Sequence, residues 1–155
     1  MTFLKLDRMV VGHGRMRLCL SWHPETPVET TPSLIDAVLH RYPAIVAHSC
    51  INSYGPTFGD AIYGTNIAHL LEHLVIEMQH EELLRAHPEL DSDPMRLNRS
   101  SDQTRLMFVG TTEIRHDLCK AVVEVSFVDD LVCARCAMSA LALIEDELSR
   151  ETLIS

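Results

Sequence analysis

The chain has 155 residues, 46% of them hydrophobic, which is enough to bury the core of one globular domain without disulfides or a structural metal. Its 22 acidic and 13 basic residues give a formal charge of −9, and this excess of acid argues against nucleic acid as a partner. The apolar runs are much shorter than the roughly 20 residues of a membrane span, and no signal-peptide pattern opens the chain. We therefore expect one cytoplasmic domain over residues 1–155 that binds neither nucleic acid nor a membrane and keeps its five cysteines reduced.

The first third of the chain predicts one strand and one short helix. Residues 15–22 alternate apolar and polar side chains with the period of a half-buried strand. Residues 23–32 contain three prolines, which is typical of a loop. Thr31 followed by Pro32 indicates a helix N-terminus, and the helical spacing of apolar residues beyond it ends at Pro43. This segment is therefore expected to be an amphipathic helix.

A glycine-containing loop and a long helix are predicted next. Residues 51–65 hold three of the six glycines and a proline, and their aromatic residues favour a loop shaped around a ligand over a flexible linker. Thr65 or Asn66 can cap a helix over residues 66–87. The apolar face of this helix is predicted to consist of Ile67, Leu70, Leu71, Leu74, Val75 and Met78.

The C-terminal half predicts a hairpin and a closing helix. Residues 88–103 are polar and follow no pattern, so we expect a mobile excursion. Residues 104–112 and 119–128 are predicted as strands of an antiparallel hairpin whose turn is residues 113–117, and a helix follows to about residue 148. This order of elements favours a single-domain α+β sandwich, in which helices cover an antiparallel sheet.

The long helix carries the motif H-x-x-E-H, formed by His69, Glu72 and His73. Histidines four residues apart on a helix lie close enough for both imidazoles to bind one metal. Zinc favours neutral imidazole and acidifies water in its open position, and a nearby carboxylate such as Glu72 can act as general base. This inverted order is the signature of the inverzincin peptidases. Spacing alone leaves ordinary helical residues open as an explanation, but polar groups within an apolar stripe need a partner, which a metal supplies.

Residues 63–79 resemble the N-terminal domain of cyanophycin synthetases, whose pattern is G-T-x-x-x-H-x-x-E-H-x-x-x-E-x-Q. The matching residues are Gly64, Thr65, His69, Glu72, His73, Glu77 and Gln79. The resemblance extends to Arg17–Ser21, to the segment PAIVAHSC that ends at Cys50, and to the turn with Gly110, Thr111 and Glu113. The chain departs from the family's pattern directly after Cys50, where the family's C-S-x-G-x-x-G-G-F is replaced by CINSYGPTF.

The resemblance implies a zinc centre on an α+β sandwich similar to the pitrilysin and S-ribosylhomocysteine lyase metalloenzymes. Cys50 is the first choice for a third ligand, because it matches the family's H-x-C position and a thiolate is a strong zinc donor. His48 is its nearest rival. Glu77 is a candidate ligand or a partner that fixes a histidine tautomer, although a solvated carboxylate is equally consistent with its position. Glu113 is a further candidate ligand or substrate contact.

Three functions follow as expectations. The first is a zinc-dependent hydrolase of peptide or isopeptide bonds, with one zinc per chain and a small peptide-like substrate similar to cyanophycin. The second is a metal-dependent lyase or isomerase, and the third is a non-catalytic metal-binding regulatory module, which the altered loop favours. Tyr54 and Phe58 are the loop side chains expected to shape the substrate pocket. The oligomeric state stays open, with a homo-oligomer among the options.

The remaining cysteines and histidines have simpler interpretations. Cys133 and Cys136 form a C-x-x-C, but no second pair accompanies them and they lie within a predicted helix, so core packing is the better interpretation. His80, His87 and His116 are expected to be surface residues.

Overall fold

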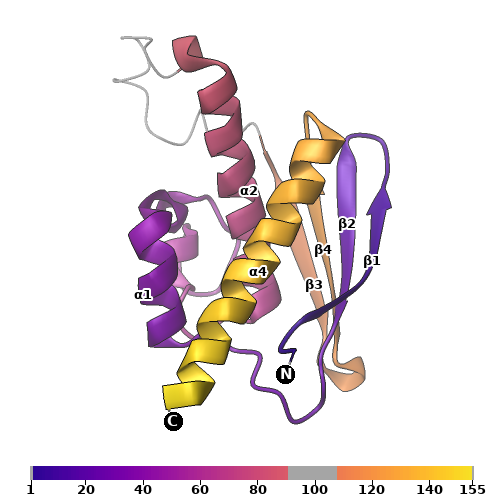
Figure 1. The fold of residues 1–155 in the computed structure, drawn as a ribbon, viewed down its shortest axis with the longest axis vertical. Helices are drawn as coiled ribbons and strands as arrows, with labels where there is room; N and C mark the ends of the chain where they lie inside the picture. The colour runs from indigo at the N-terminus through magenta and orange to yellow at the C-terminus, as the bar shows by residue number, and fades with distance from the viewer. Residues whose placement is uncertain (1, 91–107, 155) are drawn as a thin grey trace.

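A four-stranded antiparallel sheet packs against three helices in the computed structural model, which describes residues 2–90 and 108–154 (Figure 1). The spatial order of the strands is β1-β2-β4-β3, so two hairpins meet where β2 pairs with β4. The predicted α+β class is therefore confirmed. The strands are β1 (Lys5–Val11), β2 (Arg15–Ser21), β3 (Gly110–Arg115) and β4 (Lys120–Ser126). The helices are α1 (Pro32–Arg41), α2 (Ile67–Ala86) and α4 (Asp130–Ile154).

The sheet has one buried and one exposed face. On β2 the side chains of Met16 and Leu18 are fully buried, as the alternating pattern predicts, because they face the helices. On the opposite face Arg17 pairs with Glu124 of β4 at 3.3 Å and remains exposed. The core therefore lies between one face of the sheet and the helices (Figure 1).

Helix α2 is the central helix of the domain. The side chain of Asn66 accepts a hydrogen bond from Ala68 N at 2.8 Å, so Asn66 is the N-cap. The predicted apolar face is buried, and α2 packs against α4 and against strands β3 and β4. These neighbours surround its first three turns, so polar residues on the remaining faces are buried as well. The buried Gln79 side chain donates a hydrogen bond from Nε2 to the carbonyl oxygen of Ser126, the last residue of β4, at 3.1 Å.

The structure corrects several predicted boundaries. Strand β1 has no sequence-based counterpart, because most of its side chains are exposed and give no alternating pattern. The hairpin turn lies later than predicted, since residues 113–115 belong to β3 and Arg115 pairs with Lys120. The turn closes at Cys119, which adopts a left-handed conformation with φ 51°. The closing helix α4 is also longer than predicted and ends at Ile154.

Two further expectations are tested only in part. The sequence predicts an excursion over residues 88–103 and a strand over residues 104–112. Most of the excursion and the first part of that strand lie outside the described residues, because residues 91–107 are not described. His87 and His116 are exposed as expected, but the expectation for His80 is wrong, because the surrounding elements bury that face of α2. Among the described residues, no helix combines the length and the apolar character that crossing a membrane requires.

Candidate metal centre

The H-x-x-E-H residues point into one region from the first two turns of α2. His69 Nε2 and His73 Nε2 lie 3.2 Å apart, as the i, i+4 spacing predicts. Glu72 Oε2 lies 3.3 Å from His73 Nε2 and 3.6 Å from His69 Nε2. Glu72 and His73 are buried, whereas His69 is partly exposed. The helix therefore supplies two imidazoles and one carboxylate to a single point.

The segment before the loop supplies a thiol to the same point. Cys50 N donates to the Pro56 carbonyl at 3.1 Å, and Phe58 N donates to the His48 carbonyl at 2.8 Å. These bonds close the loop on itself and hold residues 48–50 beside α2. Cys50 Sγ lies 3.3 Å from His69 Nε2. One ligand atom each from Cys50, His69 and His73 lie within 4.8 Å of one another, so this group could hold a metal ion.

The electrostatic environment keeps both histidines neutral. Burial lowers the pKa of His69. Burial, followed by the neighbouring His69 and His48, holds the pKa of His73 well below its usual value. Burial raises the pKa of Glu72 to about 7 and also raises the pKa of the Cys50 thiol. Neutral imidazole is the form that binds metals, and a carboxyl with a pKa near neutrality is suited to proton transfer.

A second layer of side chains determines which nitrogen of His73 is free. His48 Nε2 lies 2.6 Å from Glu77 Oε2, and both side chains are buried. With Glu77 ionised, the carboxylate accepts and His48 Nε2 donates. Neutral His48 then accepts at Nδ1 from His73 Nδ1, 3.1 Å away. The lone pair of His73 is therefore on Nε2, which faces the metal centre.

A hydrogen-bond partner also determines which nitrogen of His69 is unprotonated. The resulting donor set of Cys50, His69 and His73 fits a cation. Thr65 Oγ1 lies 3.0 Å from His69 Nδ1 and can accept a hydrogen bond from Nδ1–H, a tautomer that leaves the lone pair on Nε2. Two unprotonated Nε2 atoms then face each other at 3.2 Å beside the sulfur of Cys50. Lone pairs this close repel, so a cation between them satisfies all three groups. An N, N, S donor set is one that zinc favours.

Other predicted site residues lie outside the donor set. Phe58 is fully buried and stacks on the ring of His73, with centroids 3.9 Å apart and planes 18° apart. The rings of Phe58 and His69 meet in a T-shaped arrangement with centroids 4.9 Å apart, so Phe58 packs against both imidazoles. Tyr54 is 78% exposed, and Glu113 is exposed on β3. Neither Tyr54 nor Glu113 lines the cavity above the donor set.

A cavity of about 530 Å³ opens above the metal centre. Glu72 and the three candidate ligands form part of its wall. The edge strand β3 and the residues just before it form the opposite side. A molecule in this cavity would therefore meet the donor set and the Glu72 carboxylate together.

Gly110 has a role that sequence reasoning missed. A Cβ at this position would lie 2.8 Å from Glu72 Cγ and 3.1 Å from the backbone oxygen of Glu124. Only a glycine lets β3 approach the carboxylate this closely. In the sequence, only the resemblance at the turn with Gly110, Thr111 and Glu113 points to this glycine. That resemblance does not show that Gly110 makes room for the Glu72 side chain.

Comparisons of the chain with protein-family models, with curated proteins and with solved structures found no match. The resemblance to the cyanophycin synthetase domain therefore rests on the motif residues themselves. What the structure establishes is a cysteine and two histidines placed to hold a metal ion, beside a buried glutamate and an open cavity.

Proposed function

We propose that this protein is a zinc-dependent hydrolase of amide bonds in peptides or isopeptides, with one zinc per chain. The observation that carries the proposal is the convergence of Cys50 Sγ, His69 Nε2 and His73 Nε2 beside Glu72 in the wall of a cavity. Three protein ligands are the usual complement of a catalytic zinc, which keeps one position open. When bound, the metal would polarise a carbonyl group and acidify a water molecule.

Glu72 is the residue that moves the proton. Its Oε2 lies 3.3 Å and 3.6 Å from the two histidine Nε2 atoms, so it is adjacent to the open side of the donor set. Burial raises its pKa to about 7, which lets it take a proton from the attacking water and return it to the leaving nitrogen near neutral pH. The close approach of Gly110 fixes where this carboxylate can lie.

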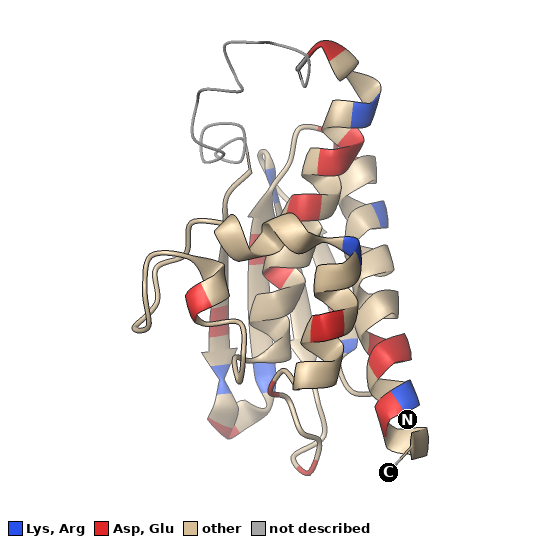
Figure 2. Cartoon of the chain, turned by 90° about the vertical axis from the view of Figure 1, so that its left-hand side faces the viewer, with Lys and Arg blue, Asp and Glu red and all other residues tan. Residues whose placement is uncertain are grey.

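The resemblance described above supports a small peptide-like substrate, and cyanophycin is one of the polymers to be tested. Nucleic acid remains disfavoured as a partner because of the acidic excess, and the described Lys and Arg residues visible in Figure 2 are spread over several elements. A metal-dependent lyase or isomerase is the second candidate. It is favoured by Cys50, because that chemistry can use the same cysteine and two histidines.

Glu72→Gln tests the proposal. The test uses zinc-loaded protein and a broad panel of peptides, isopeptides and cyanophycin. We expect turnover to fall by a factor of about 100 or more, the scale of losing a general base, while zinc content and thermal unfolding stay unchanged. Glu82→Gln is the matched control, because Glu82 lies on the same helix and pairs with Arg85 and Arg135 outside the cavity. If the panel gives no turnover that depends on Glu72 while zinc is fully bound, the lyase and the regulatory module replace the hydrolase.

A further inference from the structure

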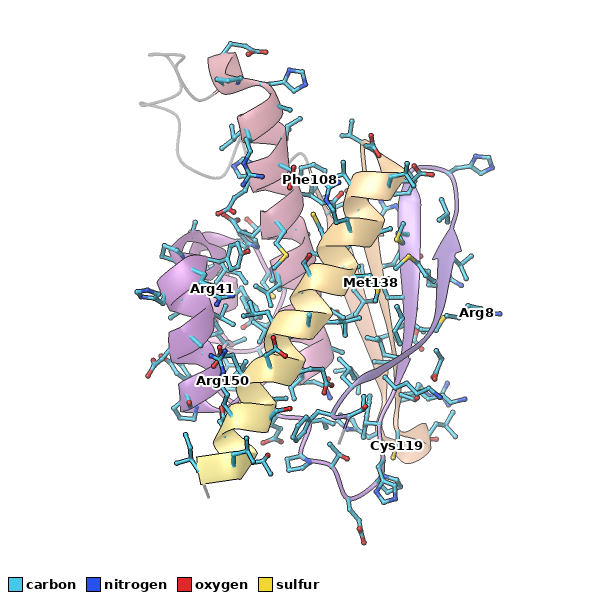
Figure 3. The ribbon with its side chains drawn as sticks, viewed as in Figure 1. Arg8, Arg41, Phe108, Cys119, Met138 and Arg150 are labelled. Atoms are coloured by element: carbon cyan, nitrogen blue, oxygen red, sulfur yellow. The ribbon has the colours of Figure 1, made fainter. Side chains whose placement is uncertain are left out.

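The cavity wall is largely apolar where it adjoins the metal centre. Ile51 follows Cys50 directly, and Ile76 lies one turn after Glu72 on the same face of α2. On the opposite side the wall continues through the segment that enters β3. Phe108, the first described residue of that segment, is buried and is labelled next to α2 in the view of Figure 3. The apolar lining residues are Ile51, Ile76, Phe108, Val109 and Ile114.

The same wall offers almost no charge. Within residues 2–90 and 108–154, Glu72 is the only carboxylate in the lining, and no Lys or Arg takes part in it. Besides the apolar residues, Glu72, the candidate metal ligands and His48, the lining consists of Ser49, Gly110, Thr111 and Thr112. Among the described residues, the other acidic side chains therefore lie outside this wall, and an arginine or aspartate side chain in the cavity would meet no charged partner there other than Glu72.

We infer that the substrate carries an uncharged, apolar side chain next to the bond that is cut, and not the arginine or aspartate of cyanophycin. The inference rests on the proposed hydrolase function. A charged side chain that leaves water without a partner pays a desolvation penalty, whereas an aliphatic or aromatic one is favoured by its contact with the isoleucines. Glu72 is the base of the proposed reaction and lies beside the candidate ligands, 3.3 Å from His73 Nε2, so its carboxylate is not a site reserved for a substrate guanidinium.

Binding of small hydroxamates to the zinc-loaded protein, measured by calorimetry, tests the inference without catalysis. Acetohydroxamate reports the affinity of the zinc-binding group alone. Acetyl-leucine, acetyl-arginine and acetyl-aspartate hydroxamates add a side chain to the same group. We expect the leucine compound to bind about tenfold or more tighter than acetohydroxamate, since burying one such side chain is worth at least that factor. The arginine and aspartate compounds should bind no tighter than acetohydroxamate.

Two variants locate the preference on the wall. Ile114→Ala should weaken the leucine compound severalfold and leave acetohydroxamate unchanged. Val122→Ala is the matched control, since Val122 is a half-buried strand residue outside the cavity. Ile51→Asp changes a fully exposed residue, so folding is not at risk. It should improve binding of the arginine compound, whereas Ile51→Asn should not.

The outcomes of these binding measurements distinguish a failure of the substrate inference from a failure of the hydrolase proposal. If the arginine or aspartate compound binds as tightly as the leucine compound or more tightly, the inference is overturned and the hydrolase proposal stays intact. If acetohydroxamate and the other three all fail to bind zinc-loaded protein, no metal position is open, and both the inference and the hydrolase proposal are overturned.

Discussion

Two regions of this protein bring a cysteine close to another group that can bind a metal, and they differ in their surroundings. Cys133 and Cys136 lie one turn apart at the start of α4 and are buried among apolar residues. Burial raises the pKa of Cys133 to about 12 and the pKa of Cys136 to about 11. Cys50 instead lies in the cavity wall, 3.3 Å from His69 Nε2. The C-x-x-C pair is packing, as predicted, and the cysteine distant in sequence from its partners is the candidate ligand.

The contrast shows that spacing is a weaker guide than environment. Residues three apart on a helix share a face in both regions, so geometry along the helix does not distinguish them. What distinguishes the metal centre is the second layer of polar partners, in which Glu77 and His48 orient His73 while Thr65 orients His69. Nothing comparable is found for Cys133 and Cys136 in the part of the chain that the structure describes.

The largest expected difference between the regions is in thiol reactivity. With zinc bound, Cys50 should react with iodoacetamide about 100-fold more slowly than after a chelator has removed the metal, because the metal shields the sulfur. Cys133 and Cys136 should stay slow in both states, since a raised pKa leaves almost no thiolate at pH 8. Residue-resolved mass spectrometry measures all five cysteines in one sample. If Cys50 is labelled at the same rate with and without the chelator, Cys50 is not a metal ligand.

A smaller effect is expected from the second layer. Glu77→Gln replaces the buried carboxylate beside His48 Nε2 with a neutral amide that can also donate, so the protons of His48 and His73 are less firmly fixed and zinc affinity should fall by about 10- to 100-fold. Competition with a fluorescent chelator measures this change, and the spectrum of the cobalt-substituted protein reports a change in coordination. Glu82→Gln is again the control. Unchanged affinity and spectrum in Glu77→Gln would show that the chain from Glu77 to His73 does not orient the ligand.

The smallest of these effects concerns Gly110. In Gly110→Ala the new methyl group forces Glu72 or β3 to move by a few tenths of an ångström, so turnover should fall about tenfold with zinc content unchanged. Gly12→Ala is a matched control, because its nearest contact would be an ordinary 3.6 Å to the Arg15 oxygen. Turnover and zinc content are measured on both variants. Full activity in Gly110→Ala would mean that the position of Glu72 is not set by this contact.

Local patterns explain which parts of the fold could be predicted. The helical repeat and the Asn66 cap defined α2, and the alternation around Met16 and Leu18 defined β2, since both signals come from one buried side. Strand β1 and the end of β3 are largely exposed, so their polar side chains look like loop or turn residues in the sequence. Glu113 and Arg115 were therefore assigned to the hairpin turn.

The candidate site follows the same division. His69, Glu72 and His73 could be predicted because they share one helix, and Cys50 because of a resemblance in its short motif. The His48–Glu77 contact joins residues 29 positions apart, and the approach of Gly110 to Glu72 joins a strand to a helix. Such contacts depend on tertiary packing, which no local pattern contains.

The metal content of the purified protein tests the central claim most directly. Elemental analysis of zinc-loaded, dialysed protein should give about one zinc per chain for the wild type and for Glu72→Gln, because the proposed function assigns Glu72 as the base and not as a ligand. His69→Ala and His73→Ala should each lose the metal, since two protein ligands cannot hold it through dialysis. Stoichiometric zinc in the double variant His69→Ala/His73→Ala would contradict a metal centre at this site.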